Sequence, residues 1–215
     1  MGQALTRGRF ITFEGGEGAG KTTQVALLAT ALERHGIAAV TTREPGGSPG
    51  AEEIRRLLLT GAPERWDAEC EALLMVAARR SHLTATIWPA LAAGRVVICD
   101  RFADSTEAYQ GWGGALPRER LVELHRLIAG DFMPDLTLIF DLPVAEGIAR
   151  ALARQGTETR FERMDLDFHE RLRLGFLDIA HREAHRAVII DARPDVARVA
   201  AAVMAAVRER LGLPV

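Results

Sequence analysis

The residues with the clearest chemistry lie near the N-terminus, in the segment Gly15-Gly16-Glu17-Gly18-Ala19-Gly20-Lys21-Thr22. This segment matches the phosphate-loop pattern G-x-x-x-x-G-K-[ST] at every fixed position. Its glycines let successive backbone N–H groups point at phosphate oxygens, and a following helix adds the positive end of its dipole. In such loops the lysine, here Lys21, reaches the β- and γ-phosphates, and the Thr22 hydroxyl ligates Mg²⁺. The segment therefore predicts binding of a nucleoside triphosphate with Mg²⁺, but not which molecule accepts the phosphate.

Lys21 is the only lysine of the chain, although lysine and arginine together number 27. Asparagine is absent. A shortage of both residues is typical of codon bias toward G and C, which explains the many arginines without any function. The wide planar fork of arginine fits a narrow phosphate-wrapping loop poorly, whereas the lysine ammonium is a compact charge. The lysine at position 21 therefore has a chemical explanation that composition does not give.

A second charged pair, Asp100 and Arg101, directly follows the apolar run Val96-Val97-Ile98-Cys99. Ligands of open α/β sheets bind at the carboxyl ends of the strands, where this pair is expected. Asp100 is a candidate to hold Mg²⁺ or its water shell, and Arg101 to grip a phosphate. The alternative is that the two side chains neutralise each other or a neighbouring loop.

Strands must carry these residues, and the apolar β-branched runs predict them at 10–14, 38–43, 95–100, 136–141 and 187–191. Helical patterns lie near 20–35, 50–60, 67–93, 117–130, 143–154, 164–184 and 194–211, with Pro89 expected to kink or divide the third. Gly36 and Gly94 are expected to end helices. We predict loops at the glycine-rich segment 110–114 and at the polar segment 154–160. The alternation of strands and helices predicts an α/β doubly wound fold.

Composition limits the class of protein. A chain of 215 residues with 48% hydrophobic residues and no linker-like tract suits a single domain over 1–215. The net charge of −2 argues against a general nucleic-acid binder. The longest uncharged stretch, 81–94, is shorter than the about 18 residues of a membrane-spanning helix, so a soluble, cytoplasmic protein is expected. Cys70 and Cys99 cannot form a disulfide framework, and we expect a buried thiol at Cys99.

Several further motifs, taken in chain order, resemble those of bacterial thymidylate kinases. The phosphate loop carries the acid Glu17 at its third position, as in that family. The other matching segments are Thr42-Arg43-Glu44-Pro45-Gly46-Gly47, Ile54-Arg55, Ala77-Ala78-Arg79, Asp100-Arg101-Phe102, Ser105-Thr106-Glu107-Ala108-Tyr109-Gln110-Gly111, Pro134-Asp135-Leu136-Thr137-Leu138 and Asp191-Ala192. The resemblance implies a P-loop NTPase-type three-layer fold with a five-stranded parallel sheet flanked by helices. It also implies the reaction ATP + dTMP = ADP + dTDP, with Mg²⁺, in dTTP biosynthesis.

The resemblance also implies roles for individual residues. The ATP-binding set is Gly15, Gly16, Glu17, Gly18, Ala19, Gly20, Lys21, Thr22 and Thr23, with Thr22 and Asp100 at the metal. In the dTMP site the resemblance implies that Arg55 and Arg101 hold the phosphate. At the sugar, Glu17 lies near the 3′-hydroxyl and Tyr109 crowds the 2′ position. At the base, Arg79 bonds the thymine edge, and Thr106 and Gln110 lie nearby. A mobile lid at about 150–163 carries Arg154 and Arg160.

Two departures from the family pattern concern this site. The position four before Arg79, usually an aromatic that stacks on thymine, is Met75, which offers a flexible, polarisable contact. The acid usually found before the lid arginine is Thr159. A monophosphate acceptor is already anionic, so catalysis should depend on positioning and charge neutralisation by Lys21, Mg²⁺, Arg101 and a lid arginine. We expect the finger-like arginine to be Arg160, with Arg154 second and Glu162 assisting the metal water or forming an ion pair.

Three alternatives remain at this point. The chain could be a related nucleotide or nucleoside kinase in which Met75 signals a different base preference. It could be a non-enzymatic nucleotide switch, although a switch has no need of arginines placed for a second anion. A nucleic-acid-dependent ATPase is disfavoured by the charge balance. The resemblance further implies a homodimer, and the apolar residues Leu73, Leu74 and Val76 allow one.

Overall fold

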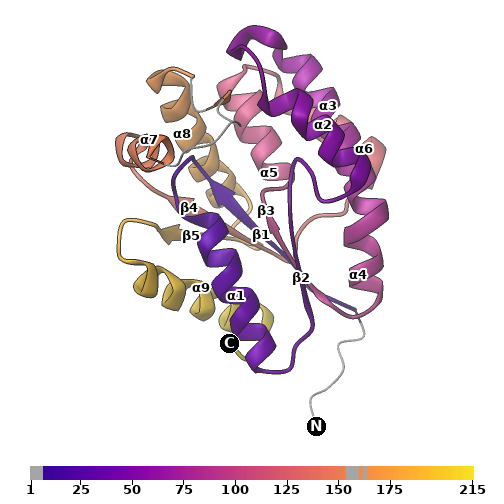
Figure 1. The fold of residues 1–215 in the computed structure, drawn as a ribbon, viewed down its shortest axis with the longest axis vertical. Helices are drawn as coiled ribbons and strands as arrows, with labels where there is room; N and C mark the ends of the chain where they lie inside the picture. Colours follow the sequence, from indigo (N-terminus) through magenta and orange to yellow (C-terminus); the bar gives the residue numbers. More distant parts are fainter. Residues whose placement is uncertain (1–6, 154–159, 162–163) are drawn as a thin grey trace.

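Five parallel strands form the sheet of the described residues, 7–153, 160–161 and 164–215, in a computed structural model (Figure 1). In chain order the strands are β1 Phe10–Gly15, β2 Ala39–Arg43, β3 Val96–Asp100, β4 Leu136–Asp141 and β5 Ala187–Asp191. Across the sheet the order is β2-β3-β1-β4-β5. The predicted five-stranded parallel sheet is therefore confirmed. Because β1 is central, its carboxyl end adjoins the ends of both β3 and β4.

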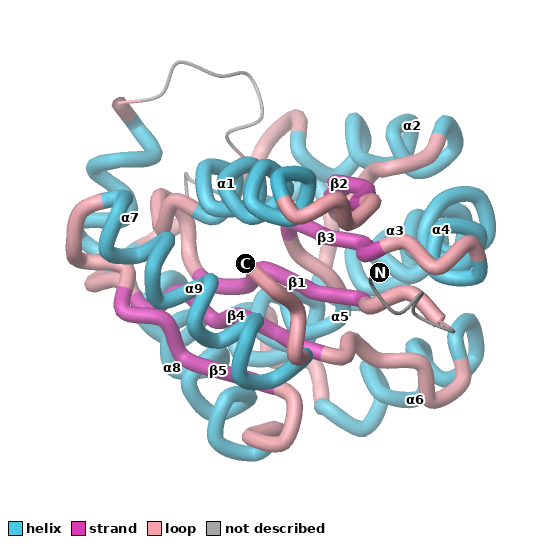
Figure 2. Tube along the Cα trace, turned by 90° about the horizontal axis from the view of Figure 1, so that it is seen from below, coloured by secondary structure: helices cyan, strands magenta, loops and turns pink. Residues whose placement is uncertain are grey.

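Helices cover both faces of the sheet, which gives the three layers expected from the sequence (Figure 2). One face carries α1 Lys21–Arg34 and α9 Val196–Leu211, which contact each other. The other face carries α3 Ala68–His82, α4 Trp88–Ala92, α5 Ala103–Thr106, α6 Arg118–Ala129 and α8 Leu166–Arg182. α2 Pro49–Leu59 and α7 Val144–Leu152 lie beyond the carboxyl ends of the strands, toward the top of Figure 1. These two helices flank the edge where ligands bind in such sheets.

The core consists of apolar side chains packed on both faces of the sheet. Leu28 of α1 and Val203 of α9 are fully buried on one face, and Ile87 and Leu172 on the other. Cys99 is fully buried, as expected, and burial raises the pKa of its thiol well above the usual value. Burial on both faces explains why the strand sequences are almost continuously apolar.

The predicted helix boundaries agree with the structure where glycine or proline set them. Gly36 follows α1 with φ 70° and Gly94 follows α4 with φ 73°, the left-handed conformation that glycine tolerates. The helical pattern 67–93 is divided ahead of Pro89, where a π-helical turn, Leu83–Ile87, joins α3 to α4. Because Pro89 has no N–H, it cannot donate the backbone hydrogen bond that a continuous α-helix would need at this position, and the helix changes type just before it.

The prediction of a loop at 110–114 is wrong for most of that segment. Residues Glu107–Gly113 form a π-helical segment that continues α5. The glycines serve packing: a Cβ on Gly113 would lie 2.4 Å from a ring carbon of Phe168 in α8, and one on Gly111 would lie 3.2 Å from Leu121. The close approach of neighbouring helices, and not a turn, therefore explains the glycine content.

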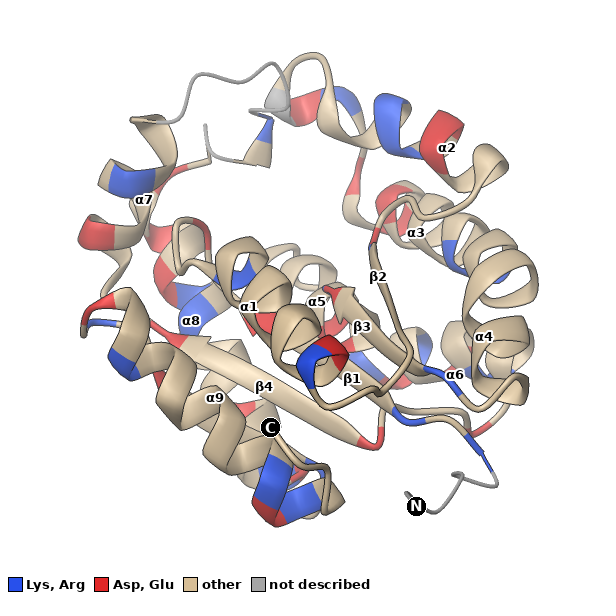
Figure 3. Ribbon diagram, turned by 60° about the horizontal axis from the view of Figure 1, so that its bottom comes forward, with Lys and Arg blue, Asp and Glu red and all other residues tan. Residues whose placement is uncertain are grey.

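Charged residues of both signs are spread over the helices, with red and blue segments interspersed on the ribbon in Figure 3. This distribution fits the near-neutral total charge. Within the described residues, no helix is long and apolar enough to cross a membrane.

Candidate active site

The phosphate loop connects the end of β1 to the start of α1 and is shaped by its glycines. Gly15, Gly18 and Gly20 have φ values of 129°, 69° and 85°, which residues with side chains rarely adopt. Gly20 occupies the N-cap position of α1, so the free N–H groups of the first helical turn face the loop. The sequence context and the backbone conformation of this segment thus suit the anion binding predicted for it.

Lys21 is the first residue of α1, and its side chain folds back into the loop. Its Nζ donates hydrogen bonds to the carbonyl oxygens of Gly15 at 3.0 Å and Gly16 at 2.7 Å. Burial, and next the charge of Arg101, lower the pKa of Lys21 to about 8. The ammonium is therefore held inside the loop, where an incoming anionic phosphate would favour its charged form.

The side chains predicted to hold Mg²⁺ meet at the same edge. The Thr22 hydroxyl donates a hydrogen bond to Oδ2 of Asp100 across 2.6 Å. The parallel register that aligns Phe13 with Asp100 brings β3 to this position. The described chain has no cluster of three or more His, Cys, Asp or Glu that could hold a metal. A hydroxyl and a carboxylate suit Mg²⁺, which binds through one or two protein oxygens together with phosphate oxygens and waters.

Arg101 adopts a left-handed backbone conformation, φ 73°, directly after β3. This unusual conformation turns its side chain back over the phosphate loop, where Nη1 donates to the Gly15 carbonyl at 2.9 Å. Its Nη2 pairs with Glu17 at 3.1 Å, and its guanidinium lies 5.0 Å from the centre of the Tyr109 ring. Strained backbone conformations of this kind concentrate at functional sites.

Glu17, the acid within the loop, is bound from two sides. Besides the Arg101 contact, it accepts a hydrogen bond from the Tyr109 hydroxyl at 2.5 Å. Burial alone would raise the pKa of Glu17, but the charges of Arg101 and Lys21 and the Tyr109 hydrogen bond outweigh burial and lower it to about 2. Glu17 is therefore an anion at neutral pH, available as a hydrogen-bond acceptor.

A cleft of about 620 Å³ opens beside the phosphate loop. Its walls come from the loop, the end of β2, the segment before α2, and the Asp100–Arg101 pair. Arg55 of α2 lines the same cleft and donates from Nη1 to the Pro45 carbonyl at 2.7 Å. The Glu44–Pro45 peptide bond is cis. The cleft thus places a second set of cations opposite the phosphate loop, as a second anionic substrate requires.

A family model described as Thymidylate kinase matches residues 13–203. The chain is 54% identical over 209 residues to the thymidylate kinase of Caulobacter vibrioides, covering 97% of this chain and 100% of that relative. It is 57% identical over 194 residues to that of Ruegeria pomeroyi, covering 90% and 92%. The chain belongs to the thymidylate kinase family. The crystal structure of thymidylate kinase from Ehrlichia chaffeensis matches with a TM-score of 0.77 at 37% identity, covering 94% of this chain and 98% of that chain.

The resemblance inferred from the motifs is confirmed by these comparisons, so the chain is a kinase of the thymidylate kinase family. As expected of neighbouring helical residues, one of the pair Arg79 and Arg80 faces inward. Arg79 is 2% exposed and donates to Glu44 at 2.8 Å and to Thr106 at 2.7 Å. Arg80 is exposed and donates to the carbonyl of Ile128.

In the thymidylate kinase fold of this chain, two helices interlock beside the predicted base position. Glu71, Met75 and Arg79 are spaced four residues apart and share one face of α3. Thr106 and Gln110 come from α5 and the π-helical segment opposite. Arg79 bonds Thr106, and Glu71 accepts from the Gln110 amide at 3.0 Å. Met75 lies in α3 between these two contacts, partly buried against the apolar cluster that contains Tyr109.

Arg160 lies away from the phosphate loop in this structure. It is 1% exposed, pairs with Glu71 of α3, and donates to the carbonyls of Leu58 and Ala62 at the end of α2. The other lid residues named from the sequence, Arg154, Thr159 and Glu162, lie outside the described residues.

Sequence reasoning missed three buried carboxylates that support the site. Glu14 accepts from the Phe102 N–H at 2.7 Å and the Ser105 hydroxyl at 2.5 Å, which fixes the turn that carries Arg101. Burial, and next the charge of Asp104, raise the pKa of Glu14 to about 7. The other two are Glu44 and Glu71, bound to Arg79 and Arg160. Of the three, only Glu14 has a signal in the sequence, as an acid at the end of the otherwise apolar run of β1.

The phosphate loop also touches α7 through two glycines. A Cβ on Gly18 would lie 2.0 Å from the Gly147 carbonyl oxygen, and a Cβ on Gly147 would lie 2.5 Å from the Glu17 carbonyl oxygen. The loop and this helix therefore pack backbone against backbone.

Proposed function

We propose that this member of the thymidylate kinase family transfers the γ-phosphoryl group of ATP to the phosphate of dTMP. The observation that carries the proposal is that Arg101 joins two anion-binding regions, the phosphate loop and the cleft lined by Arg55. A phosphate oxygen of dTMP forms the new bond to the γ-phosphorus. The bond from that phosphorus to the β–γ bridging oxygen breaks, giving ADP and dTDP.

ATP binds with its β- and γ-phosphates in the loop Gly15–Thr22, next to Lys21 and Thr23. Thr22 and Asp100 would hold Mg²⁺, which supplies charge neutralisation and orientation of the triphosphate when bound. The Lys21 ammonium, already placed in the loop by its bonds to Gly15 and Gly16, contacts the transferring phosphoryl group. These groups act by electrostatic stabilisation in a site prepared before the substrate arrives.

The dTMP molecule binds in the cleft opposite the loop. Arg55 and Arg101 hold its phosphate, as the family resemblance implies, and both side chains line the cleft. The anionic Glu17 accepts a hydrogen bond from the 3′-hydroxyl, while Tyr109, fixed by its bond to Glu17, occupies the space that a 2′-hydroxyl would need. No general base is required, because the attacking phosphate oxygen is already ionised near neutral pH.

Thymine binds between α3 and the segment that follows α5. Arg79, Thr106 and Gln110 are buried. Arg79 donates a hydrogen bond to Thr106, and Gln110 donates one to Glu71, which is typical of a rigid recognition site. Met75 provides an apolar contact in place of the aromatic residue usual in the family. The lid at about 150–163 belongs to the same single domain, and its arginines Arg154 and Arg160 are proposed to approach the phosphates during transfer.

We also propose that the protein is a homodimer, as the family resemblance implies. Leu73 of α3 is 53% exposed and is available for such contacts, whereas Val76 is buried within the protomer. Light scattering coupled to size-exclusion chromatography measures the mass in solution. A mass near 23.4 kDa would contradict the dimer.

A coupled ADP-release assay with dTMP, dUMP, dCMP and AMP tests the proposed reaction. We expect the highest kcat/KM with dTMP, dependent on ATP and Mg²⁺. Phosphorylation of AMP but not dTMP would overturn the assignment and favour a related kinase with another base preference. ATP binding without transfer to any monophosphate would instead indicate a nucleotide switch.

A further inference from the structure

The orientation of the Gln110 amide is fixed by a partner that can only accept hydrogen bonds. Gln110 is 1% exposed, and its Nε2 donates to Oε2 of Glu71 at 3.0 Å. The other oxygen of Glu71, Oε1, is bound by Arg160. An ionised carboxylate offers no donor, so the nitrogen of the amide must face Glu71 and the oxygen must face away.

The oxygen on the other side of this amide has no donor among the residues that the structure describes. Gln110 Oε1 is enclosed and has no hydrogen-bond partner within the described part of the chain. Such an atom is rare in a folded protein and calls for an explanation, because a buried unpaired acceptor is costly. A ligand that brings an N–H group to this position would remove the cost.

The surroundings indicate which ligand that is. Gln110 and Thr106 are four residues apart, and Thr106 is bound to Arg79 on the opposite helix. The proposed base site between α3 and the segment after α5 therefore offers a donor, the Arg79 guanidinium, and an acceptor, Gln110 Oε1. Thymine presents the complementary pair, an O4 acceptor beside an N3–H donor. Cytosine presents the reverse pair, an amino donor beside an unprotonated N3.

We infer that Glu71 is a positioning residue for base selection: its carboxylate accepts from the Gln110 amide nitrogen and so holds Oε1 toward the base, and the site therefore accepts N3–H and rejects cytosine. The inference rests on the proposed function, since it assumes that dTMP is the acceptor. Glu71 itself does not touch the base. Its effect passes through the single hydrogen bond to Gln110.

The test compares dissociation constants for dTMP and dCMP, measured by calorimetry. Glu71→Gln replaces the carboxylate by an amide that can donate or accept, so Gln110 is free to turn over. The dCMP-to-dTMP ratio of dissociation constants should then fall by about tenfold, the worth of one hydrogen bond. Glu71→Asp keeps an acceptor-only group and should retain the wild-type ratio even where both affinities weaken.

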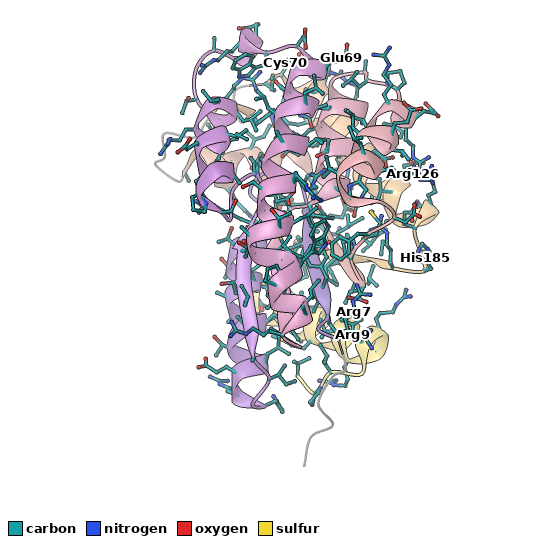
Figure 4. All side chains as sticks on the ribbon, turned by 90° about the vertical axis from the view of Figure 1, so that its right-hand side faces the viewer. Arg7, Arg9, Glu69, Cys70, Arg126 and His185 are labelled. Atoms are coloured by element: carbon teal, nitrogen blue, oxygen red, sulfur yellow. The ribbon has the colours of Figure 1, made fainter. Side chains whose placement is uncertain are left out.

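Glu69→Gln is the matched control on the same helix. Glu69 lies on the outer surface at the start of α3 and pairs with the exposed Arg120 (Figure 4). This variant should leave the ratio within about twofold of wild type. The inference would be overturned if Glu71→Gln kept the wild-type ratio of the dCMP and dTMP dissociation constants. It would also be overturned if Glu71→Asp and Glu71→Gln lowered this ratio equally, because the effect would then not depend on an acceptor-only group.

A measurement on the wild-type protein covers the case in which Glu71→Gln does not fold. In N3-methyl-dTMP a methyl group replaces the N3 hydrogen, while both ring carbonyls remain. We expect it to bind about tenfold more weakly than dTMP, and equal affinities would overturn the inference. Failure of the wild-type protein to phosphorylate dTMP contradicts the proposed function, whereas normal phosphorylation with an unchanged ratio contradicts only the role of Glu71.

Discussion

The Thr22 hydroxyl lies 2.6 Å from Oδ2 of Asp100, although 78 residues separate the two in the chain. One oxygen belongs to the first turn of α1 and the other to the end of β3. The hydrogen bond holds both oxygens beside the phosphate loop, next to the proposed place of the triphosphate. Two fixed oxygens of this kind need little rearrangement to share the coordination shell of one Mg²⁺ ion.

Asp100→Asn should raise the Mg²⁺ concentration needed for half-maximal activity by about tenfold or more, because the variant loses an anionic group at the metal. A magnesium titration of initial rates at saturating ATP and dTMP measures the change. Asp131→Asn serves as the control, since Asp131 is 91% exposed and pairs with Arg126 on the surface. If Asp100→Asn reached half-maximal activity at the same Mg²⁺ concentration as the wild type, Asp100 would be excluded from the metal site.

Lys21→Arg should lower kcat/KM by about 10²-fold or more, although the charge is kept. The lysine ammonium makes two carbonyl contacts at 2.7 and 3.0 Å inside the loop, and a guanidinium is too wide to make both. The affinity for dTMP, measured by calorimetry, should remain at the wild-type value and show that the fold is intact. Near-normal turnover would mean that the lone lysine has no special role in transfer.

Glu14→Gln should flatten the dependence of stability on pH. Burial raises the pKa of Glu14 to about 7 in the folded state, above its unfolded value, so the folded state binds the proton more tightly. The contribution of Glu14 to stability should therefore be greatest below about pH 4.5 and fall as the pH rises toward 7, by roughly 3 kcal/mol at most. Urea denaturation at several pH values measures this fall in the wild type and its reduction in Glu14→Gln.

The exposed Glu33 of α1 provides the comparison for this experiment. Glu33→Gln should retain the wild-type loss of stability between pH 5 and pH 8. If Glu14→Gln retained it as well, the buried carboxylate would not be the group that titrates.

Arg160→Ala should lower the free energy of unfolding by about 3–5 kcal/mol, because it leaves the buried Glu71 carboxylate without its ion-pair partner. Thermal or urea denaturation measures this change. The same variant tests the catalytic role predicted from the sequence, which requires kcat to fall by about 10³-fold with both substrates saturating. Turnover near the wild-type rate, in protein shown to be folded, would mean that Arg160 has a structural role only.

The sheet and the phosphate loop could be predicted because their signals are local. Each buried strand is a short apolar run, and the loop is a contiguous motif with a strand before it and a helix after it. The π-helical segment Glu107–Gly113 could not be predicted in this way. Its glycines resemble turn residues until Phe168 of α8, far away in the chain, is seen to pack against Gly113.

The buried ion pairs were hidden for the same reason. Arg186 binds Asp104 at 2.8 Å across 82 residues, and Arg160 binds Glu71 across 89. In the sequence these are charged residues among many, in a chain whose composition favours arginine. Only the fold shows that each pair is enclosed, and that Glu71 also accepts a hydrogen bond from Gln110.

The backbone contact between Gly18 and Gly147 limits how this enzyme can diversify. Both positions must therefore remain glycine together, because a side chain at either one would force α7 away from the phosphate loop. A change at position 147 cannot relieve this contact, because a Cβ on Gly18 meets the backbone oxygen of Gly147, so a mutagenesis library should yield few folded variants at position 18.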